Sequence, residues 1–302
     1  MRRPTALLPT LAAGALRVAT RAGSAASAAE PRPGRTRIRT RDGASLFHRD
    51  WGSGPPVVFV HGLSLSSSMW NYQEAFLGDH GLRCISFDRR GHGRSDQSSP
   101  SCDLNTFADD IAAVIDGLDL HGVTLVGHSV GCGEIIRYIA RHGSSRVSRV
   151  VMLAPTTPFV LQTADNPFGP PAAYFEQMRA AWAADYPRWL YENRAPFFTP
   201  DTSPQMTEWI ELELRKAHVS TAIAYHRMYV GTDLRPDLAK IDRPVLILHG
   251  DKDASAPLEI TGRRTALGIP GAVLKVYTGA PHGLFVSHMN QVNRDVLAFV
   301  NS

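Results

Sequence analysis

Short, mostly apolar runs recur along the chain from residue 57 onward, and stretches with helical spacing separate most of them. Such runs are typical of strands that are buried on both faces of a parallel sheet. Their alternation with helical segments therefore predicts a parallel sheet with helices packed against it. The predicted buried strands are 57–60, 84–87, 123–126, 150–153, 245–248 and 273–276, and the predicted helices are 68–79, 106–118, 130–142 and 291–300.

Two earlier segments, 37–41 and 45–51, flank the dipeptide Asp42-Gly43 and predict an antiparallel pair of strands. With the six buried runs they complete a mostly parallel sheet of eight strands. The fold class is therefore α/β.

One region interrupts this alternation, because no buried-strand run occurs between the sixth and seventh predicted strands. Aromatic and proline residues crowd together in 158–198, and helical periodicity around Trp182 and Ile210 predicts amphipathic helices inserted after the sixth strand. Their apolar stripes either pack in a core or cover a substrate pocket, and one helix can do both. The predicted organisation is a leader at 1–34, a core at 35–155 and 237–302, and a helical cap at 156–236.

Positive charge is concentrated at the start of the chain. The first 41 residues hold nine Arg and one Glu, a net charge of +8, so the remainder carries +4 minus 8, or about −4. This remainder has no basic patch interleaved with aromatic residues, so nucleic acid is not an expected partner.

The leader has features of a targeting segment. Arg2-Arg3, a short apolar stretch and Ala26-Ser27-Ala28 fit a secretory signal. The segment is also rich in Arg, Ala and Ser and nearly free of acidic residues, so the competing interpretations are a transit peptide and a disordered extension. We expect export, secreted or periplasmic, with a cytoplasmic location as the alternative. No run of 18 apolar residues occurs, so stable membrane insertion is not expected.

Cysteine and histidine spacing gives no sign of a metal site. Cys84, Cys102 and Cys132 are odd in number and form no CxxC pair, which indicates neither a disulfide framework nor a zinc site. His, Asp and Cys do not cluster at metal-ligand spacing, and the glycines form no dinucleotide-binding motif. We therefore expect no metal and no cofactor.

The most informative motif is Gly-His-Ser-Val-Gly at 127–131, between a predicted buried strand and a predicted helix. A serine at such a tight turn is typical of a catalytic nucleophile, because the strained backbone exposes its hydroxyl and the glycines let strand and helix approach. The same five residues also arise by chance as a glycine-bordered turn. The assignment of Ser129 therefore depends on its partners.

A nucleophilic serine needs a histidine base and a carboxylate that orients the histidine. His282 follows a predicted strand in a loop rich in Gly and Pro, and is the candidate base. Asp251 and Asp253 both follow the strand 245–248; Asp253 is preferred because the loop must extend a few residues to reach the pocket, and Asp251 is the alternative. Open α/β sheets bind ligands beyond the carboxyl ends of their strands, where all these candidates lie.

Acyl transfer also requires two backbone N–H donors for the oxyanion. Val130 directly follows the serine, and Leu63 follows the end of the strand 57–60, so their amides are the candidates. For the histidines near these positions, a structural or pocket-lining role is favoured over proton transfer. The candidate pocket residues are His61, His128, Phe159 and Trp182.

The chain order of serine, acid and histidine resembles that of the α/β-hydrolase family. The segment Asp-Arg-Arg-Gly-His-Gly-Arg-Ser at 88–95 looks like the turn after the fourth strand of that family, and 280–284 looks like its cofactor-free haloperoxidase and esterase branch. The resemblance covers about residues 37–302. It implies a serine hydrolase that cleaves a small carboxylic ester or lactone through an acyl enzyme. In that family the acid follows the glycine by three positions, which favours Asp253.

Two positions depart from that branch. Its haloperoxidase-like and perhydrolase members tend to have an aromatic residue and then proline after His-Gly, whereas Leu63 and Ser64 stand here. His128 stands in place of a common phenylalanine. Both departures favour hydrolysis. The alternatives are a haloperoxidase or perhydrolase that uses peroxide and a carboxylic acid, and a receptor-like ligand-binding protein with little turnover.

Overall fold

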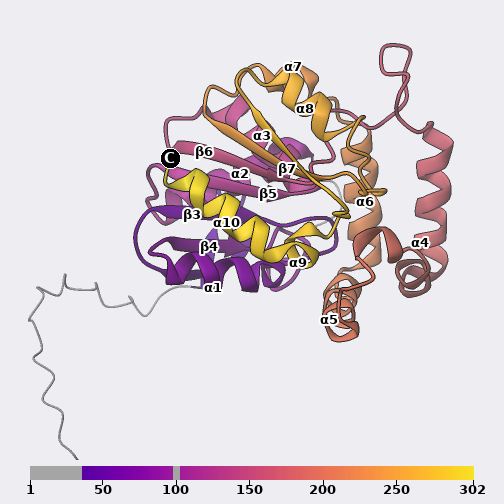
Figure 1. The fold of residues 1–302 in the computed structure, drawn as a ribbon, viewed down its shortest axis with the longest axis horizontal. Helices are drawn as coiled ribbons and strands as arrows, with labels where there is room; N and C mark the ends of the chain where they lie inside the picture. The colour runs from indigo at the N-terminus through magenta and orange to yellow at the C-terminus, as the bar shows by residue number, and fades with distance from the viewer. Residues whose placement is uncertain (1–35, 98–102) are drawn as a thin grey trace, which may run out of the picture. The chain divides into compact units, whose positions relative to one another are not determined.

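A mixed sheet of eight strands lies at the centre of the computed structural model, which describes residues 36–97 and 103–302 (Figure 1). The strand order is β1-β2-β4-β3-β5-β6-β7-β8; β1 and β2 pair antiparallel, as do β2 and β4, and the other neighbours are parallel. The predicted mostly parallel sheet is confirmed. The strands are β1 (Arg37–Arg39), β2 (Ser45–Gly52), β3 (Pro56–Val60), β4 (Arg83–Phe87), β5 (Val123–His128), β6 (Val147–Leu153), β7 (Val245–Gly250) and β8 (Val273–Tyr277).

Helices pack on both faces of this sheet and explain why its central strands are apolar throughout. Val58 and Leu125 lie in one hydrophobic cluster with side chains of α2 (Leu104–Gly117) and α3 (Val130–His142). The alternate strand residues lie in a second cluster, with side chains of α1 (Asn71–Asp79) and α10 (Met289–Val300). Because successive side chains point to opposite faces, both clusters draw on the same strands.

Helix boundaries differ from the predicted ones by a few residues. The predicted helix 68–79 begins as the 3-10 helix η1 (Ser67–Trp70) and continues as α1. The predicted helix 106–118 begins two residues earlier because the Asp103 side chain accepts a hydrogen bond from the Thr106 amide at 2.9 Å. The predicted helix 130–142 coincides with α3, which ends before Gly143 at a φ of 76°.

Between β6 and β7 the chain forms α4 (Ala172–Glu192), η2 (Ala195–Phe197), α5 (Pro204–Arg215), α6 (Val219–Val230) and α7 (Arg235–Leu238). We call α4 to α6 the inserted helices; α4, α5 and α6 lie beyond one end of the sheet (Figure 1). The side chains that predicted them, Trp182 and Ile210, are buried. The described residues cluster as one compact unit, and the boundaries of a separate cap stay a prediction. The remaining helices are α8 (Gly262–Gly268) and α9 (Leu284–Ser287).

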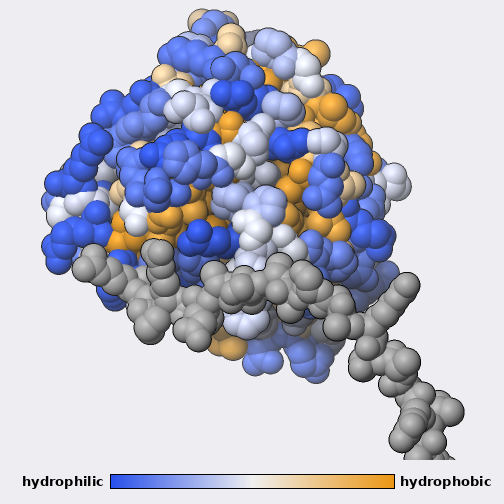
Figure 2. Space-filling view, turned by 90° about the vertical axis from the view of Figure 1, so that its left-hand side faces the viewer, coloured by the Kyte–Doolittle hydropathy of each residue, from blue (hydrophilic) through white to orange (hydrophobic). Residues whose placement is uncertain are grey.

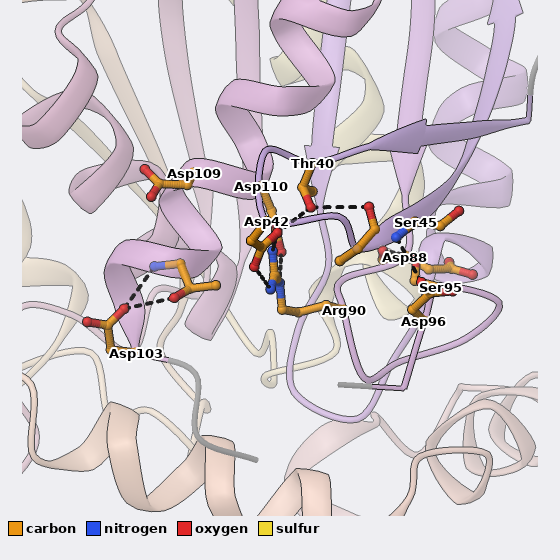
Figure 3. A network of polar contacts seen from close by, with 12 residues as sticks. Thr40, Asp42, Ser45, Asp88, Arg90, Ser95, Asp96, Asp103, Asp109 and Asp110 are labelled. Atoms are coloured by element: carbon orange, nitrogen blue, oxygen red, sulfur yellow. Dashed lines mark hydrogen bonds and ion pairs between the residues drawn. The ribbon is translucent and has the colours of Figure 1, made fainter. Parts of the chain in front are cut away.

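A polar network fixes the turn after β4 against the first strands (Figure 3). Arg90 donates to Asp110 of α2 and to Asp42 of the β1–β2 turn, each at 2.7 Å. Ser95 accepts from the Phe47 amide of β2 at 2.8 Å. These bonds hold the segment 88–95 in the position from which Arg89 reaches the candidate site.

Figure 2 shows hydrophilic side chains around separate apolar areas on one face of the molecule. Isolated exposed apolar side chains, such as Trp51 and Leu267, are usual on folded proteins. No described helix has a long enough apolar stretch to cross a membrane. The predicted leader at 1–34 and Cys102 lie outside the described residues, whereas Cys84 and Cys132 are buried free thiols.

Candidate active site

Ser129 stands at a strained turn between β5 and α3. Its φ of 55° and ψ of −120° lie outside the regions that side chains with a Cβ readily adopt. The glycines on either side are sterically required: a Cβ on Gly131 would approach the Val60 carbonyl oxygen to 2.5 Å, and one on Gly127 would approach the Cys132 nitrogen to 2.9 Å. The turn therefore has the tight geometry that the sequence predicted.

Three candidate residues from three separate loops meet at this turn. His282 Nε2 lies 2.9 Å from Ser129 Oγ, and His282 Nδ1 lies 2.7 Å from Asp253 Oδ2. Ser129 follows β5, Asp253 follows β7 and His282 follows β8, and all three side chains are buried. The result is a continuous chain of hydrogen bonds from hydroxyl to carboxylate.

The environment of Asp253 keeps its carboxylate ionised. Burial alone raises the pKa of Asp253, but the charge of His282 and hydrogen bonds from His249 and His282 lower it more. The net pKa lies well below the ordinary 3.8. The second oxygen, Oδ1, accepts from the Ala256 amide at 2.7 Å. An ionised carboxylate fixed in this way can accept the Nδ1 proton of His282 and leave Nε2 to accept from the serine.

Asp251, the alternative acid, has a different position. It is exposed, and its Oδ1 accepts a hydrogen bond from the Gly279 amide at 2.7 Å. This bond joins the loop after β7 to the loop after β8. Of the two acids, the structure brings Asp253 to His282.

The two candidate oxyanion amides both adjoin the nucleophile turn. Val130 is the first residue of α3, and its amide is one of the helix N-terminal donors that lack an intrahelical acceptor. Leu63 follows Gly62, and a Cβ on Gly62 would approach His128 Nδ1 to 2.6 Å. Within the described part of the chain, neither the Leu63 amide nor the Val130 amide donates to a protein acceptor. Both are available to a substrate oxygen.

The pocket candidates separate into two groups. Trp182 lies in a buried cluster of the inserted helices against which Leu63 packs. Phe159 instead packs against the Arg235 guanidinium, whose Cζ lies 5.2 Å from the ring centroid. The inserted helices thus reach the loop of Leu63 through Trp182, while Phe159 belongs to a different contact.

A protein-family model for the alpha/beta hydrolase family matches residues 57–295. The chain belongs to this family. Its relatives include a non-heme chloroperoxidase of Streptomyces lividans, 38% identical over 88% of this chain and 99% of that protein. A bifunctional esterase/perhydrolase of Acinetobacter calcoaceticus is 34% identical over the same shares. The solved structure of an esterase from Exiguobacterium antarcticum matches with a TM-score of 0.85 and 31% identity, over 88% of this chain and 99% of that chain.

His128 of this alpha/beta hydrolase lies behind the catalytic candidates. Its Nε2 lies 3.0 Å from the backbone carbonyl oxygen of His282, so it donates there. Burial, and then the nearby charge of His282, lower the pKa of His128 to about 3. A neutral, buried ring in hydrogen-bond contact with the His282 backbone supports a structural role for His128.

His61 has a structural environment as well. The Arg89 amide donates to His61 Nε2 at 2.9 Å, so the ring proton lies on Nδ1, 2.8 Å from the Gly62 carbonyl oxygen. Burial, and then the charge of Arg89, hold the pKa of His61 well below 6.5. His61 therefore stays neutral beside the loop that carries Leu63.

Two contacts that were not predicted from the sequence join the loops of the site to the segment between β6 and β7. Tyr186 of α4 donates to Ser64 Oγ at 2.7 Å, directly after Leu63. In the loop after β8, the Gly283 amide donates to the backbone carbonyl oxygen of Phe197 in η2 at 3.1 Å. Phe197 lies in the aromatic segment 158–198, which is the one signal that could have pointed to it.

A buried ion pair supports the loop after β3, which carries His61 and Leu63. Arg89 donates to Glu134 Oε1 at 2.5 Å and to the His61 carbonyl oxygen at 2.6 Å. Tyr225 of α6 donates to Glu134, and its ring lies 4.7 Å from Arg89 Cζ. The network therefore connects α3, the loop after β3 and the inserted helices.

We expect Glu134→Gln to lower the free energy of unfolding by about 3–5 kcal/mol, because it leaves the buried guanidinium of Arg89 without a counter-charge. Urea unfolding followed by circular dichroism measures this loss. Glu176→Gln, at an exposed position of α4, is the matched control and should change stability by less than about 0.5 kcal/mol. Equal stability of the two variants would contradict the assigned role of the ion pair.

No group of three or more His, Cys, Asp or Glu side chains in the described residues has an arrangement that could hold a metal ion. The expectation that the protein needs no metal or cofactor stays a prediction.

Proposed function

We propose that this hydrolase cleaves carboxylic esters or lactones through an acyl enzyme formed on Ser129. The observation that carries the proposal is the continuous hydrogen-bond chain from Ser129 through His282 to Asp253. A histidine with one nitrogen on a hydroxyl and the other on an ionised carboxylate is arranged to accept the hydroxyl proton. Esterases among the relatives and solved structures support the same reaction class.

In the proposed reaction, Ser129 Oγ attacks the substrate carbonyl carbon while His282 Nε2 accepts the hydroxyl proton. The amides of Leu63 and Val130 stabilise the negative oxygen of the tetrahedral intermediate. His282 then returns the proton to the leaving alcohol, which departs as the acyl–Ser129 ester remains. Water attacks this ester with His282 again as the base, and the carboxylic acid and the free serine result. Asp253 stays ionised throughout and stabilises the charged imidazole.

Perhydrolase chemistry is the second candidate, because relatives with esterase/perhydrolase and chloroperoxidase names match 88% of this chain at 34% and 38% identity. One feature favours hydrolysis. Ser64 has a φ of 59°, and a proline ring fixes φ near −65°. Proline could not adopt the conformation of this loop at the position where the haloperoxidase-like branch tends to carry it. The conformation of this loop therefore does not fit the proline that the resemblance associates with the haloperoxidase-like branch.

A comparison of two assays tests whether the protein is a hydrolase or a perhydrolase. The first follows hydrolysis of aryl, short-chain, long-chain and cyclic esters without peroxide. The second follows peroxide-dependent bromination in acetate buffer at the same enzyme concentration. We expect ester or lactone hydrolysis to be the faster reaction. Faster peroxide-dependent bromination would assign the protein to the perhydrolase alternative, and hydrolysis no faster than that of Ser129→Ala would indicate a ligand-binding protein.

A further inference from the structure

A second histidine contacts the carboxylate of Asp253. His249, near the end of β7, is fully buried. Its Nε2 lies 2.8 Å from the backbone carbonyl oxygen of Ala256 and 3.3 Å from Asp253 Oδ2. Both neighbours are acceptors, so Nε2 must carry a proton, which it shares between them with the shorter bond to the Ala256 oxygen.

The opposite side of the ring has no polar partner. His249 Nδ1 is buried without a hydrogen bond in the described part of the chain. It faces Gly262, the first residue of α8, where an added Cβ would collide with the ring. A bare Nδ1 lone pair against a glycine fits the neutral tautomer with its proton on Nε2. Gly262 thus gives the ring the space that it needs between β7 and α8.

We propose that His249 is a positioning residue that fixes the Asp253 carboxylate for His282, an inference that rests on the function proposed above. Asp253 Oδ2 is the oxygen that faces both histidines, and Oδ1 is held by the Ala256 amide. Because His249 also donates to the Ala256 carbonyl, one ring braces both the side chain and the loop that returns from it.

This arrangement opposes rotation of the Asp253 side chain and transfer of the His282 proton to Asp253, both of which would impair catalysis. Rotation of the Asp253 side chain would break the bonds from His249 and the Ala256 amide together, so the carboxylate keeps one orientation. A second donor on Oδ2 also lowers its basicity, which agrees with the lowered pKa of Asp253. When His282 becomes charged, its Nδ1 proton therefore stays on the imidazole.

The test compares His249→Leu, which removes the donor, with His249→Gln, whose side-chain amide keeps one. We expect His249→Leu to lower kcat for ester hydrolysis by about 10- to 100-fold, the usual range for a hydrogen bond to a charged group, with KM within about twofold. His249→Gln should recover most of the lost kcat. A structural role alone would not produce a loss confined to kcat that an amide donor restores.

A second comparison uses the Asp253→Asn background. There the carboxylate is absent, so adding His249→Leu should lower kcat by less than about threefold. If His249→Leu does not fold, Gly262→Ala displaces the ring while keeping the histidine, and should also lower kcat at unchanged KM.

Two outcomes would overturn the inference: an unchanged kcat in the folded His249→Leu or Gly262→Ala variant, or equal losses in His249→Leu and His249→Gln. Neither outcome touches the proposed function, which is tested separately by the loss of ester hydrolysis in Ser129→Ala. If Ser129→Ala is inactive and His249→Leu is fully active, the inference about His249 alone is wrong.

Discussion

Replacing Ser129 with alanine should lower kcat for ester hydrolysis by about a millionfold. Without Oγ, no acyl enzyme forms, and the base at His282 has no hydroxyl to activate. The amides proposed to bind the oxyanion remain, so a small rate above the uncatalysed reaction persists. Steady-state kinetics with an activated ester measures the loss, and circular dichroism verifies the fold.

Ser148→Ala is the matched control. Ser148 donates to the Gly122 carbonyl oxygen at 2.8 Å, at the opposite end of β5 from the nucleophile turn. Its replacement should leave kcat within about twofold. A loss of only about tenfold in Ser129→Ala would remove the serine from the nucleophile role, since covalent catalysis accounts for much more.

The second large effect is expected at Asp253. Asp253→Asn should lower kcat by about 10,000-fold, because an amide in place of the carboxylate favours the wrong tautomer of His282 and cannot stabilise its positive charge. The side-chain size is nearly unchanged, so KM and the unfolding midpoint should change much less than kcat.

Asp251→Asn provides the comparison within the same loop. Its carboxylate is exposed and bonds the Gly279 amide, so its replacement should lower kcat by less than about threefold. A larger loss in Asp251→Asn than in Asp253→Asn would reverse the assignment of the acid. From the sequence, Asp253 was preferred because of the length of the loop and then because of the family resemblance, with Asp251 as the alternative.

The sheet and the three central residues were accessible from the sequence for a physical reason. A strand buried on both faces must be apolar at successive positions, as at Val57 and Val58, and such runs are visible without knowledge of the fold. The loops after parallel strands meet at one edge of the sheet. Candidates placed directly after strands could therefore be expected to lie together.

The contacts between the inserted helices and the core could not be predicted from the sequence pattern. Tyr186 and Ser64 are 122 positions apart, and Tyr225 and Glu134 are 91 positions apart. Pairing over such separations leaves no periodic pattern in the chain. The periodicity that predicted the helix around Trp182 gives its buried face, but not which loop that face contacts. For this reason the assignment of pocket residues stays a prediction.

The contact between His249 and Asp253 could not be predicted from the sequence either, although the two residues are close in the chain. His249 lies only four positions before Asp253, directly after the apolar run 245–248 that predicted β7, where a histidine looks like the polar end of a strand. Its hydrogen bond to the carboxylate depends on how the loop 250–256 folds back. That path is set by tertiary contacts, such as the space at Gly262.

The central claim is that Ser129 is the nucleophile, and labelling by a fluorophosphonate ester tests it most directly. The folded protein is treated with the reagent, digested, and examined by mass spectrometry while residual ester hydrolysis is followed. We predict one adduct, on the peptide that contains Ser129, in proportion to the activity lost and reduced by excess substrate. Loss of activity with the adduct on another residue, or full activity after Ser129 is labelled, would contradict the account.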